Sequence, residues 1–181
     1  MYRIAQRRCP ESLRDDVLPR SPYRFYMPDT GEHHMRLAFD AARRGIERGQ
    51  SPFGACVVRG GEVLSCEHNT VGLDHDPTAH AEVRTIREAC QRAGSHRLDG
   101  ATIYATTEPC PMCFAAIHWA RLERVVFAAR VEDAQRFGFH DLQIPTAKLR
   151  GIGVEGVEVV GDFLRNESLE LYRQWASRGG G

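Results

Sequence analysis

Lysine is nearly absent from this sequence, and so is any net charge. Lys148 is the only lysine among 24 basic side chains, which balance 24 acidic ones. A neutral chain has no overall field to attract a polyanion, although a local basic patch is compatible with a neutral total. The charge balance therefore argues against nucleic acid as a partner.

Long apolar runs are also missing. No stretch reaches the roughly 18 residues of a membrane-spanning helix, and the amino terminus lacks the apolar core of a signal peptide. We therefore expect no membrane partner and a cytoplasmic location, where the six cysteines should be thiols or metal ligands. Four of them are scattered along the chain, and those at 56 and 90 should pack as small apolar side chains: Cys9, Cys56, Cys66 and Cys90.

The length of 181 residues suits one folded domain. Residues 1–30 carry four prolines among many charges and have no amphipathic pattern, so they predict an extended arm. Residues 31–178 form the predicted domain. Residues 179–181 are all glycine and predict a disordered tail.

The patterning within the domain alternates between helix and strand. Met35, Phe39, Ala42 and Ile46 recur at helical spacing, and Gly60-Gly61 is a hairpin turn signal. These signals predict an α/β fold of three layers, α/β/α, with a central mixed five-stranded sheet flanked by helices. Helices are expected over 31–48, 79–93, 111–120, 132–136 and 163–176, and strands over 53–59, 62–67, 101–106, 124–129 and 154–160.

Three residues with metal-ligand chemistry lie where two of these helices begin. His80 starts one helix, and Cys110 and Cys113 are three apart at the start of another. Helix amino termini favour thiolates, the form of cysteine that binds zinc. With three protein ligands, the fourth tetrahedral position of a zinc ion stays open to water, as in catalytic sites. One Zn²⁺ per chain is the expected cofactor, and Glu82 is the candidate proton shuttle.

Two other interpretations account for part of this pattern. Cys110 and Cys113 alone could form a redox pair, but such a pair needs no His-x-Glu upstream. A non-catalytic zinc-stabilised binding module would need a fourth ligand, for which His118 is the nearest candidate. A structural zinc ion has no use for the carboxylate of Glu82 beside it, so Glu82 separates this module from an enzyme.

His-x-Glu followed by Pro-Cys-x-x-Cys resembles the signature of the cytidine and nucleobase deaminase superfamily. The resemblance runs from about His34 to Trp175 and is greatest to the bacterial guanine deaminases. It implies a cytidine-deaminase-like fold, with residues 31–178 as the catalytic domain. The matching stretches are Pro52-Phe53-Gly54-Ala55, Asn69, Asp76 to Val83, Glu108 to Cys113, Ala116 to Arg121, Asp133-Ala134, Gly138-Phe139 and Asp141.

The resemblance implies a reaction in which guanine and water give xanthine and ammonia. Glu82 would take a proton from the attacking water, then protonate the ring nitrogen and the departing amine. The backbone N–H groups of Ala81 and Cys110 would contact the substrate or the tetrahedral intermediate.

The resemblance also assigns residues to base recognition. Phe53 would stack on the purine, and Asn69 would read its edge with an amide that both donates and accepts. Asp133 would accept hydrogen bonds from ring N–H or amino groups, although a helix-capping role is an alternative for this residue.

The family implies a homodimer, with domain swapping left open. Bacterial guanine deaminases close the pocket with an aromatic residue at the extreme carboxyl end, whereas the last aromatics here are Tyr172 and Trp175. The sequence therefore leaves open whether the carboxyl-terminal helix or the amino-terminal arm closes the pocket. The alternative substrates are guanosine, cytosine, cytidine, a pterin and an aminotriazine. The nearest alternative enzyme is a tRNA adenosine deaminase.

Overall fold

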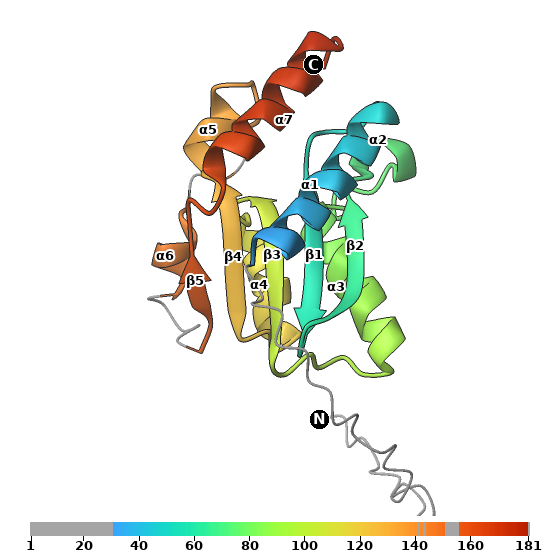
Figure 1. Cartoon of the computed structure of the whole chain (residues 1–181), viewed down its shortest axis with the longest axis vertical. Helices are drawn as coiled ribbons and strands as arrows, with labels where there is room; N and C mark the ends of the chain where they lie inside the picture. The colour runs from blue at the N-terminus through green and yellow to red at the C-terminus, as the bar shows by residue number, and fades with distance from the viewer. Residues whose placement is uncertain (1–30, 141, 143, 151–155, 181) are drawn as a thin grey trace, which may run out of the picture.

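The computed structural model describes residues 31–140, 142, 144–150 and 156–180. Its centre is a five-stranded sheet in the order β2-β1-β3-β4-β5 (Figure 1). β1 (Gly54–Arg59) pairs antiparallel with β2 (Glu62–His68) and β3 (Ala101–Thr107). β4 (Arg124–Ala129) and the short β5 (Glu158–Val160) extend the sheet in parallel. The predicted mixed five-stranded sheet is therefore confirmed.

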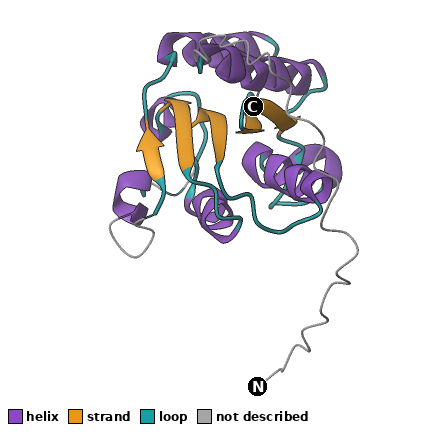
Figure 2. Cartoon of the chain, turned by 60° about the horizontal axis from the view of Figure 1, so that its bottom comes forward, coloured by secondary structure: helices purple, strands orange, loops and turns teal. Residues whose placement is uncertain are grey.

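Helices cover both faces of the sheet, which gives the predicted three layers (Figures 1 and 2). α1 (Glu32–Glu47) and α7 (Arg165–Ser177) lie on one face, and α3 (Ala81–Ala93) and α4 (Pro111–Trp119) lie on the other. Alternate residues of β1 point to opposite sides, as strand geometry requires. Ala55 and Val57 pack towards α3 and α4, whereas Cys56 and Val58 pack towards α1 and α7.

The smaller elements differ from the expected ones where they are too short to show periodicity. α2 (Val71–Asp74) is a single turn within a segment predicted as a loop. α5 (Val131–Gln135) matches the predicted short helix to within one residue, whereas α6 (Thr146–Arg150) was not predicted. The expected arm at 1–30 lies outside the described residues. At the other end, Gly179 and Gly180 donate backbone hydrogen bonds to the last turn of α7.

One cysteine expectation is wrong. The structure joins Cys56 to Cys66 in a disulfide, although these residues were expected to be separate thiols. They are direct partners in the register of β1 and β2, with Cα atoms 4.1 Å apart. Cross-strand partners lie close enough for their side chains to meet, and sequence spacing alone does not reveal that register.

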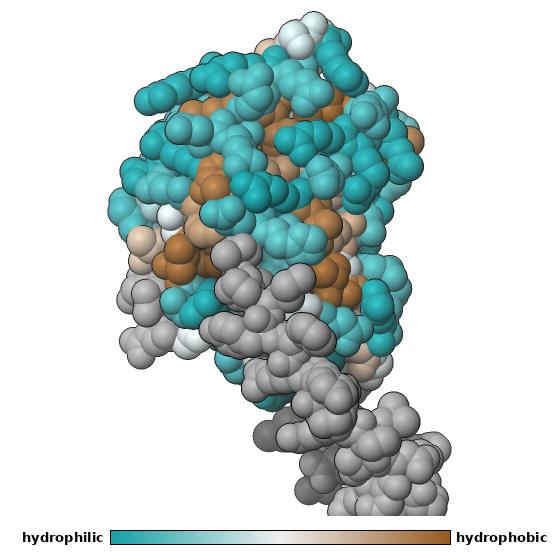
Figure 3. All heavy atoms as spheres, in the orientation of Figure 1, coloured by the Kyte–Doolittle hydropathy of each residue, from teal (hydrophilic) through white to brown (hydrophobic). Residues whose placement is uncertain are grey.

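The face that carries α1 and α7 is mostly hydrophilic, with small apolar areas between the helices (Figure 3). Within the part of the chain that is described, none of the helices has the length and apolar character needed to cross a bilayer.

Candidate active site

His80 and Cys110 occupy equivalent places at the starts of two helices. Each is the residue before the first helical turn, His80 before α3 and Cys110 before α4, and each has an extended backbone. Pro111 follows Cys110 at the first helical position, where its missing N–H costs no intrahelical hydrogen bond. Both helices start on the same side of the sheet, so their first residues meet.

Together with Cys113, these residues form a compact group of possible metal ligands. The Nδ1 atom of His80 lies 3.8 Å from Sγ of Cys110 and 3.6 Å from Sγ of Cys113, and the two sulfurs are 3.6 Å apart. Tetrahedral zinc with ordinary bond lengths places two sulfurs about 3.8 Å apart, and a sulfur and a nitrogen about 3.6 Å apart. The three donor atoms therefore fit a single zinc ion.

No other described histidine, cysteine or acidic residue belongs to this group. His118, the candidate fourth ligand, lies in the last turn of α4 with its ring against Trp119. A structural zinc site normally has four protein ligands. The described residues therefore match the three-ligand pattern of a catalytic site.

The two thiols of this group are hydrogen-bonded to each other. The hydrogen bond between the two thiols, helped by His80, lowers the pKa of Cys110 to about 4. The same hydrogen bond, with burial, raises the pKa of Cys113. Cys110 is thus the more readily ionised of the two thiols, and a zinc ion would bind both as thiolates.

Glu82 lies within the first turn of α3, beside this group, and is 7% exposed. Burial, with the Cys110 thiolate as the next cause, raises the pKa of Glu82 to about 7. A carboxyl group with a pKa near neutrality can both take and return a proton at that pH. The arrangement provides an acid-base group next to a metal site.

A small cavity opens onto these residues. Its wall combines His80, Glu82 and Cys110 with side chains from three other segments: Phe53, Asn69, Thr107 and Glu108. The structure therefore brings together the predicted ligands, the predicted proton shuttle and two of the predicted base-binding residues. Ala81 lies between two wall residues in the chain, but its own side chain is buried away from solvent.

Phe53 is positioned by close packing at the start of β1. A side chain at Gly54 would meet the backbone of α1, with the carbonyl oxygen of Ala38 only 2.2 Å from the added Cβ. Glycine at this position therefore lets the strand approach the helix. The Phe53 ring contacts Phe139 edge-on, at 4.8 Å between centroids, and Tyr172 of α7 at 6.1 Å. One end of the pocket is thus an aromatic cluster.

Asn69 is 5% exposed and its amide has a fixed orientation. Its Oδ1 accepts a hydrogen bond from the backbone N–H of Val71 at 3.1 Å, and its own backbone N–H donates to Phe53. With Oδ1 occupied by this local bond, the Nδ2 group is the part of the amide that can donate to a bound molecule.

Asp133 does not lie in the cavity wall. Its fully buried carboxylate accepts two hydrogen bonds from Arg165, both at 2.7 Å, and one from the backbone N–H of Arg130 at 3.0 Å. The Arg165 guanidinium holds the pKa of Asp133 below its ordinary value. The expected role in substrate binding is therefore not supported, because the carboxylate is already occupied. Its position in the first turn of α5, where it accepts from the backbone N–H of Arg130, fits the alternative role of a helix-capping residue.

Thr107 and Glu108 belong to the wall but had no role assigned from the sequence. Thr107 is the last residue of β3, and its hydroxyl lies 2.6 Å from the hydroxyl of Tyr172. Glu108 directly precedes Pro109-Cys110, so proximity in the chain to a ligand was the available signal. The contact with Tyr172 joins residues 65 apart, which no sequence pattern reveals.

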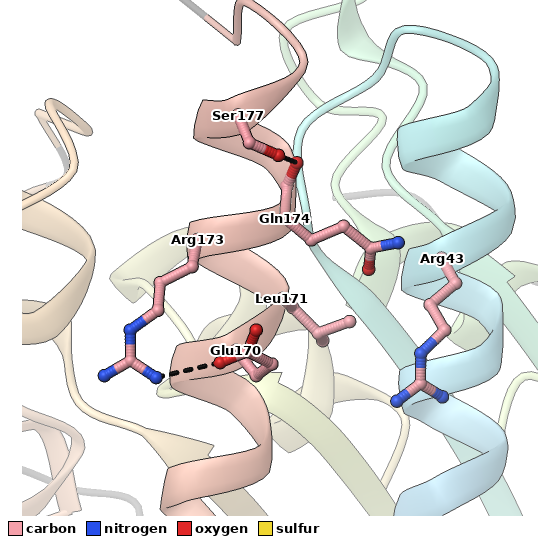
Figure 4. A pocket seen from close by; sticks show the side chains of 6 residues that line it. All are labelled: Arg43, Glu170, Leu171, Arg173, Gln174 and Ser177. Atoms are coloured by element: carbon pink, nitrogen blue, oxygen red, sulfur yellow. Dashed lines mark hydrogen bonds and ion pairs between the residues drawn. The ribbon is translucent and has the colours of Figure 1, made fainter.

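A larger hollow of about 540 Å³ lies between α1 and α7, away from the metal ligands (Figure 4). The side chains around it include no histidine or cysteine, and Arg173 pairs with Glu170 at 2.9 Å. Its volume exceeds that of the cavity at Glu82, but no group of possible metal ligands lies in its lining. Among the described residues, the metal-ligand group and the buried Glu82 carboxyl lie at the smaller cavity.

Comparisons with known proteins agree with this geometry. Guanine deaminase of Bacillus subtilis is 43% identical over 111 residues, covering 61% of this chain and 71% of the relative. A tRNA-specific adenosine deaminase of Agrobacterium fabrum is 38% identical over 149 residues, covering 79% of this chain and 91% of the relative. The structure of guanine deaminase from Nitrosomonas europaea superposes with a TM-score of 0.75 at 27% identity, covering 81% of this chain and 84% of that protein.

The family model for the cytidine and deoxycytidylate deaminase zinc-binding region matches residues 28–129. That range is more than half of the chain and contains His80, Glu82, Cys110 and Cys113. The chain therefore belongs to the cytidine and deoxycytidylate deaminase family of zinc-binding deaminases.

Proposed function

We propose that this protein hydrolyses guanine to xanthine and ammonia in a zinc-dependent reaction. The observation that carries the proposal is the buried Glu82 carboxyl beside the His80, Cys110 and Cys113 group, with Glu82, His80 and Cys110 lining one small cavity. These three residues would hold the zinc ion, which when bound would supply Lewis-acid activation of water.

Glu82 carries the proton transfers in this proposal. It takes one proton from the attacking water and delivers it to a ring nitrogen next to C2 of guanine. A second proton passes through the same carboxyl group to the amine, which leaves as ammonia while C2 becomes a carbonyl carbon. Burial keeps bulk water from competing for these protons, and the pKa near 7 makes both directions accessible.

Phe53 and Asn69 orient the base. The Phe53 ring, supported from behind by Phe139, offers a face for stacking on the purine. The Nδ2 group of Asn69 donates to an acceptor on the purine edge, because Oδ1 is held by Val71. The backbone N–H of Ala81, in the first turn of α3, has no intrahelical acceptor and is a second donor for the substrate.

The likeness to guanine deaminases in sequence and fold supports guanine as the substrate. The absence of net charge also favours a small substrate over a nucleic acid. Adenosine in tRNA is the second candidate, because the Agrobacterium tRNA-specific deaminase matches a longer part of this chain.

An ammonia-release assay on zinc-loaded protein tests the proposal. Guanine is compared with guanosine, cytosine, cytidine, adenine, a pterin and an aminotriazine, and inosine formation is measured in parallel on tRNA. We expect the highest kcat/KM on guanine, with xanthine as product. Inosine in tRNA without ammonia from guanine would replace guanine by the second candidate.

We also propose that the protein is a homodimer, as its family resemblance implies. Trp119 at the end of α4 is 70% exposed, although tryptophan is usually well buried. Aromatic side chains of this kind are enriched at protein interfaces.

A further inference from the structure

Glu108 lies in the wall of the cavity, yet the proposed reaction gives it no task. It follows the last residue of β3 and precedes Pro109-Cys110. Its backbone N–H donates to the carbonyl oxygen of Ala129 at 2.8 Å, which ties the segment to the end of β4. The backbone of Glu108 is therefore fixed by β3 before it and by its hydrogen bond to the end of β4.

The two oxygens of this carboxylate have different surroundings. Oε1 accepts hydrogen bonds from the backbone N–H of Thr146 at 2.9 Å and from its hydroxyl at 2.8 Å. Among the described residues, Oε2 receives only a long hydrogen bond from the backbone N–H of Val131, at 3.4 Å. A carboxylate oxygen offers two lone pairs. Oε1 is thus fully used by Thr146, whereas Oε2 keeps acceptor capacity.

Thr146 also fixes the orientation of the group. Its side chain is 1% exposed, and both of its donors point to the same oxygen of Glu108. A carboxylate held through one oxygen presents the other in a defined direction, so its next hydrogen bond costs little ordering entropy.

The charges around the cavity limit what Oε2 can bind. Neither lysine nor arginine is among the described residues of the wall, so none of these residues offers Oε2 a cationic partner. A carboxylate oxygen can only accept a hydrogen bond, and Asn69 offers a donor to the same cavity. The partner that fits Oε2 is an N–H donor on the bound molecule.

We propose that Glu108 is a specificity-determining residue that accepts, through Oε2, a hydrogen bond from a ring or amino N–H of the substrate. It selects heterocyclic bases that present a donor on that edge, and it takes the acidic reading role that the sequence suggested for Asp133. The inference rests on the proposed function, because it assumes that a base enters this cavity.

The substitution Glu108→Gln tests the inference with a clear structural expectation. Thr146 donates two hydrogen bonds to one position, so the amide oxygen of Gln takes that position and the NH2 group replaces Oε2. An acceptor thus becomes a donor. We would measure binding by zinc-loaded protein in a Glu82→Gln background, which prevents turnover. The probes are 8-azaguanine, with N–H donors on its six-membered ring, and purine, with only acceptors there.

We expect Glu108→Gln to weaken 8-azaguanine binding about tenfold to hundredfold, the usual worth of a hydrogen bond to a charged group. Purine binding should stay within about twofold or tighten. The matched control is Thr146→Val, which removes one hydrogen bond to Oε1 and leaves Oε2 in place. It should change the binding of both probes little and to the same extent.

The inference would be overturned if Glu108→Gln weakened the binding of both probes equally and Thr146→Val weakened it to the same extent. Glu108 would then serve only to hold the segment around residue 146 in place. Unchanged 8-azaguanine binding would overturn it too. In either case, ammonia release from guanine by the wild-type protein would leave the proposed function standing. If the wild-type protein releases no ammonia from guanine and the Glu82→Gln protein binds neither probe, the proposed function fails and the inference with it.

Discussion

Glu82 and Asp133 are both buried carboxyl groups, and their partners move their pKa values in opposite directions. Burial and the nearby Cys110 thiolate raise the pKa of Glu82 to about 7. Hydrogen bonds from Arg165 lower the pKa of Asp133. The first group can exchange protons near neutral pH, whereas the second stays ionised and serves the fold.

Replacing Glu82 by Gln should abolish turnover while the protein keeps its zinc. The side chain remains about the same size, but it can no longer accept a proton. We expect ammonia release to fall by at least about 100-fold, with one zinc per chain still found by elemental analysis. Glu88→Gln, at an exposed position of the same helix, is the control and should retain full activity. A Glu82→Gln protein that stays active would contradict the proton-shuttle role and assign the proton transfers to a different group.

Replacing Asp133 by Asn should lower stability in a pH-dependent way. Because the folded-state pKa of Asp133 is lowered, its contribution is present above its unfolded pKa of about 4 and is lost as the pH falls through the folded value. Urea unfolding should show a deficit of roughly 1–3 kcal/mol at pH 7 that shrinks below about pH 4. A deficit that is constant from pH 7 to pH 3 would contradict the role of the charge.

At the scale of elements, α7 braces the pocket from the opposite face of the sheet. The Ser168 hydroxyl donates to the carbonyl oxygen of Thr106 at 2.6 Å, and the Tyr172 hydroxyl pairs with Thr107 one residue further along β3. The Tyr172 ring stacks on Phe137 with centroids 5.1 Å apart. The carboxyl-terminal helix of the same chain thus supports the wall behind Phe53.

Tyr172→Phe should loosen this brace without removing the ring. The buried Thr107 hydroxyl loses its partner, so the free energy of unfolding should fall by about 1–2 kcal/mol in urea titrations. Arg173→Ala on the exposed side of α7 should change it by less than about 0.5 kcal/mol. If the two variants are equally stable, the hydroxyl pair contributes nothing measurable.

At the scale of the whole molecule, an exposed Trp119 is consistent with assembly of two chains. Light scattering at micromolar concentration should give the mass of a dimer, and Trp119→Glu should shift it towards the monomer by placing a charge in an apolar contact. Leu73→Glu, at another exposed apolar position, is a matched control for the added charge. A monomeric wild-type protein would contradict the proposed homodimer.

The sequence alone determined the fold class and the metal-binding group. Long helices and strands have periodicities that identify them locally, and His80, Glu82, Cys110 and Cys113 are recognisable because ligand spacing at helix starts is also local. The short α2 and α6 were not predicted, whereas α5, also of five residues, was predicted to within one residue.

The tertiary structure decided which residues meet across the chain. It placed Arg165 against Asp133 and Thr146 against Glu108, and it set Cys56 opposite Cys66. Each of these contacts depends on strand register or on how a helix near the carboxyl end packs onto the sheet. A short stretch of sequence reveals neither the register nor the packing. A carboxylate's role follows from its partners, so the sequence could find the acidic residues but only the fold could separate the occupied Asp133 from Glu108 in the pocket wall.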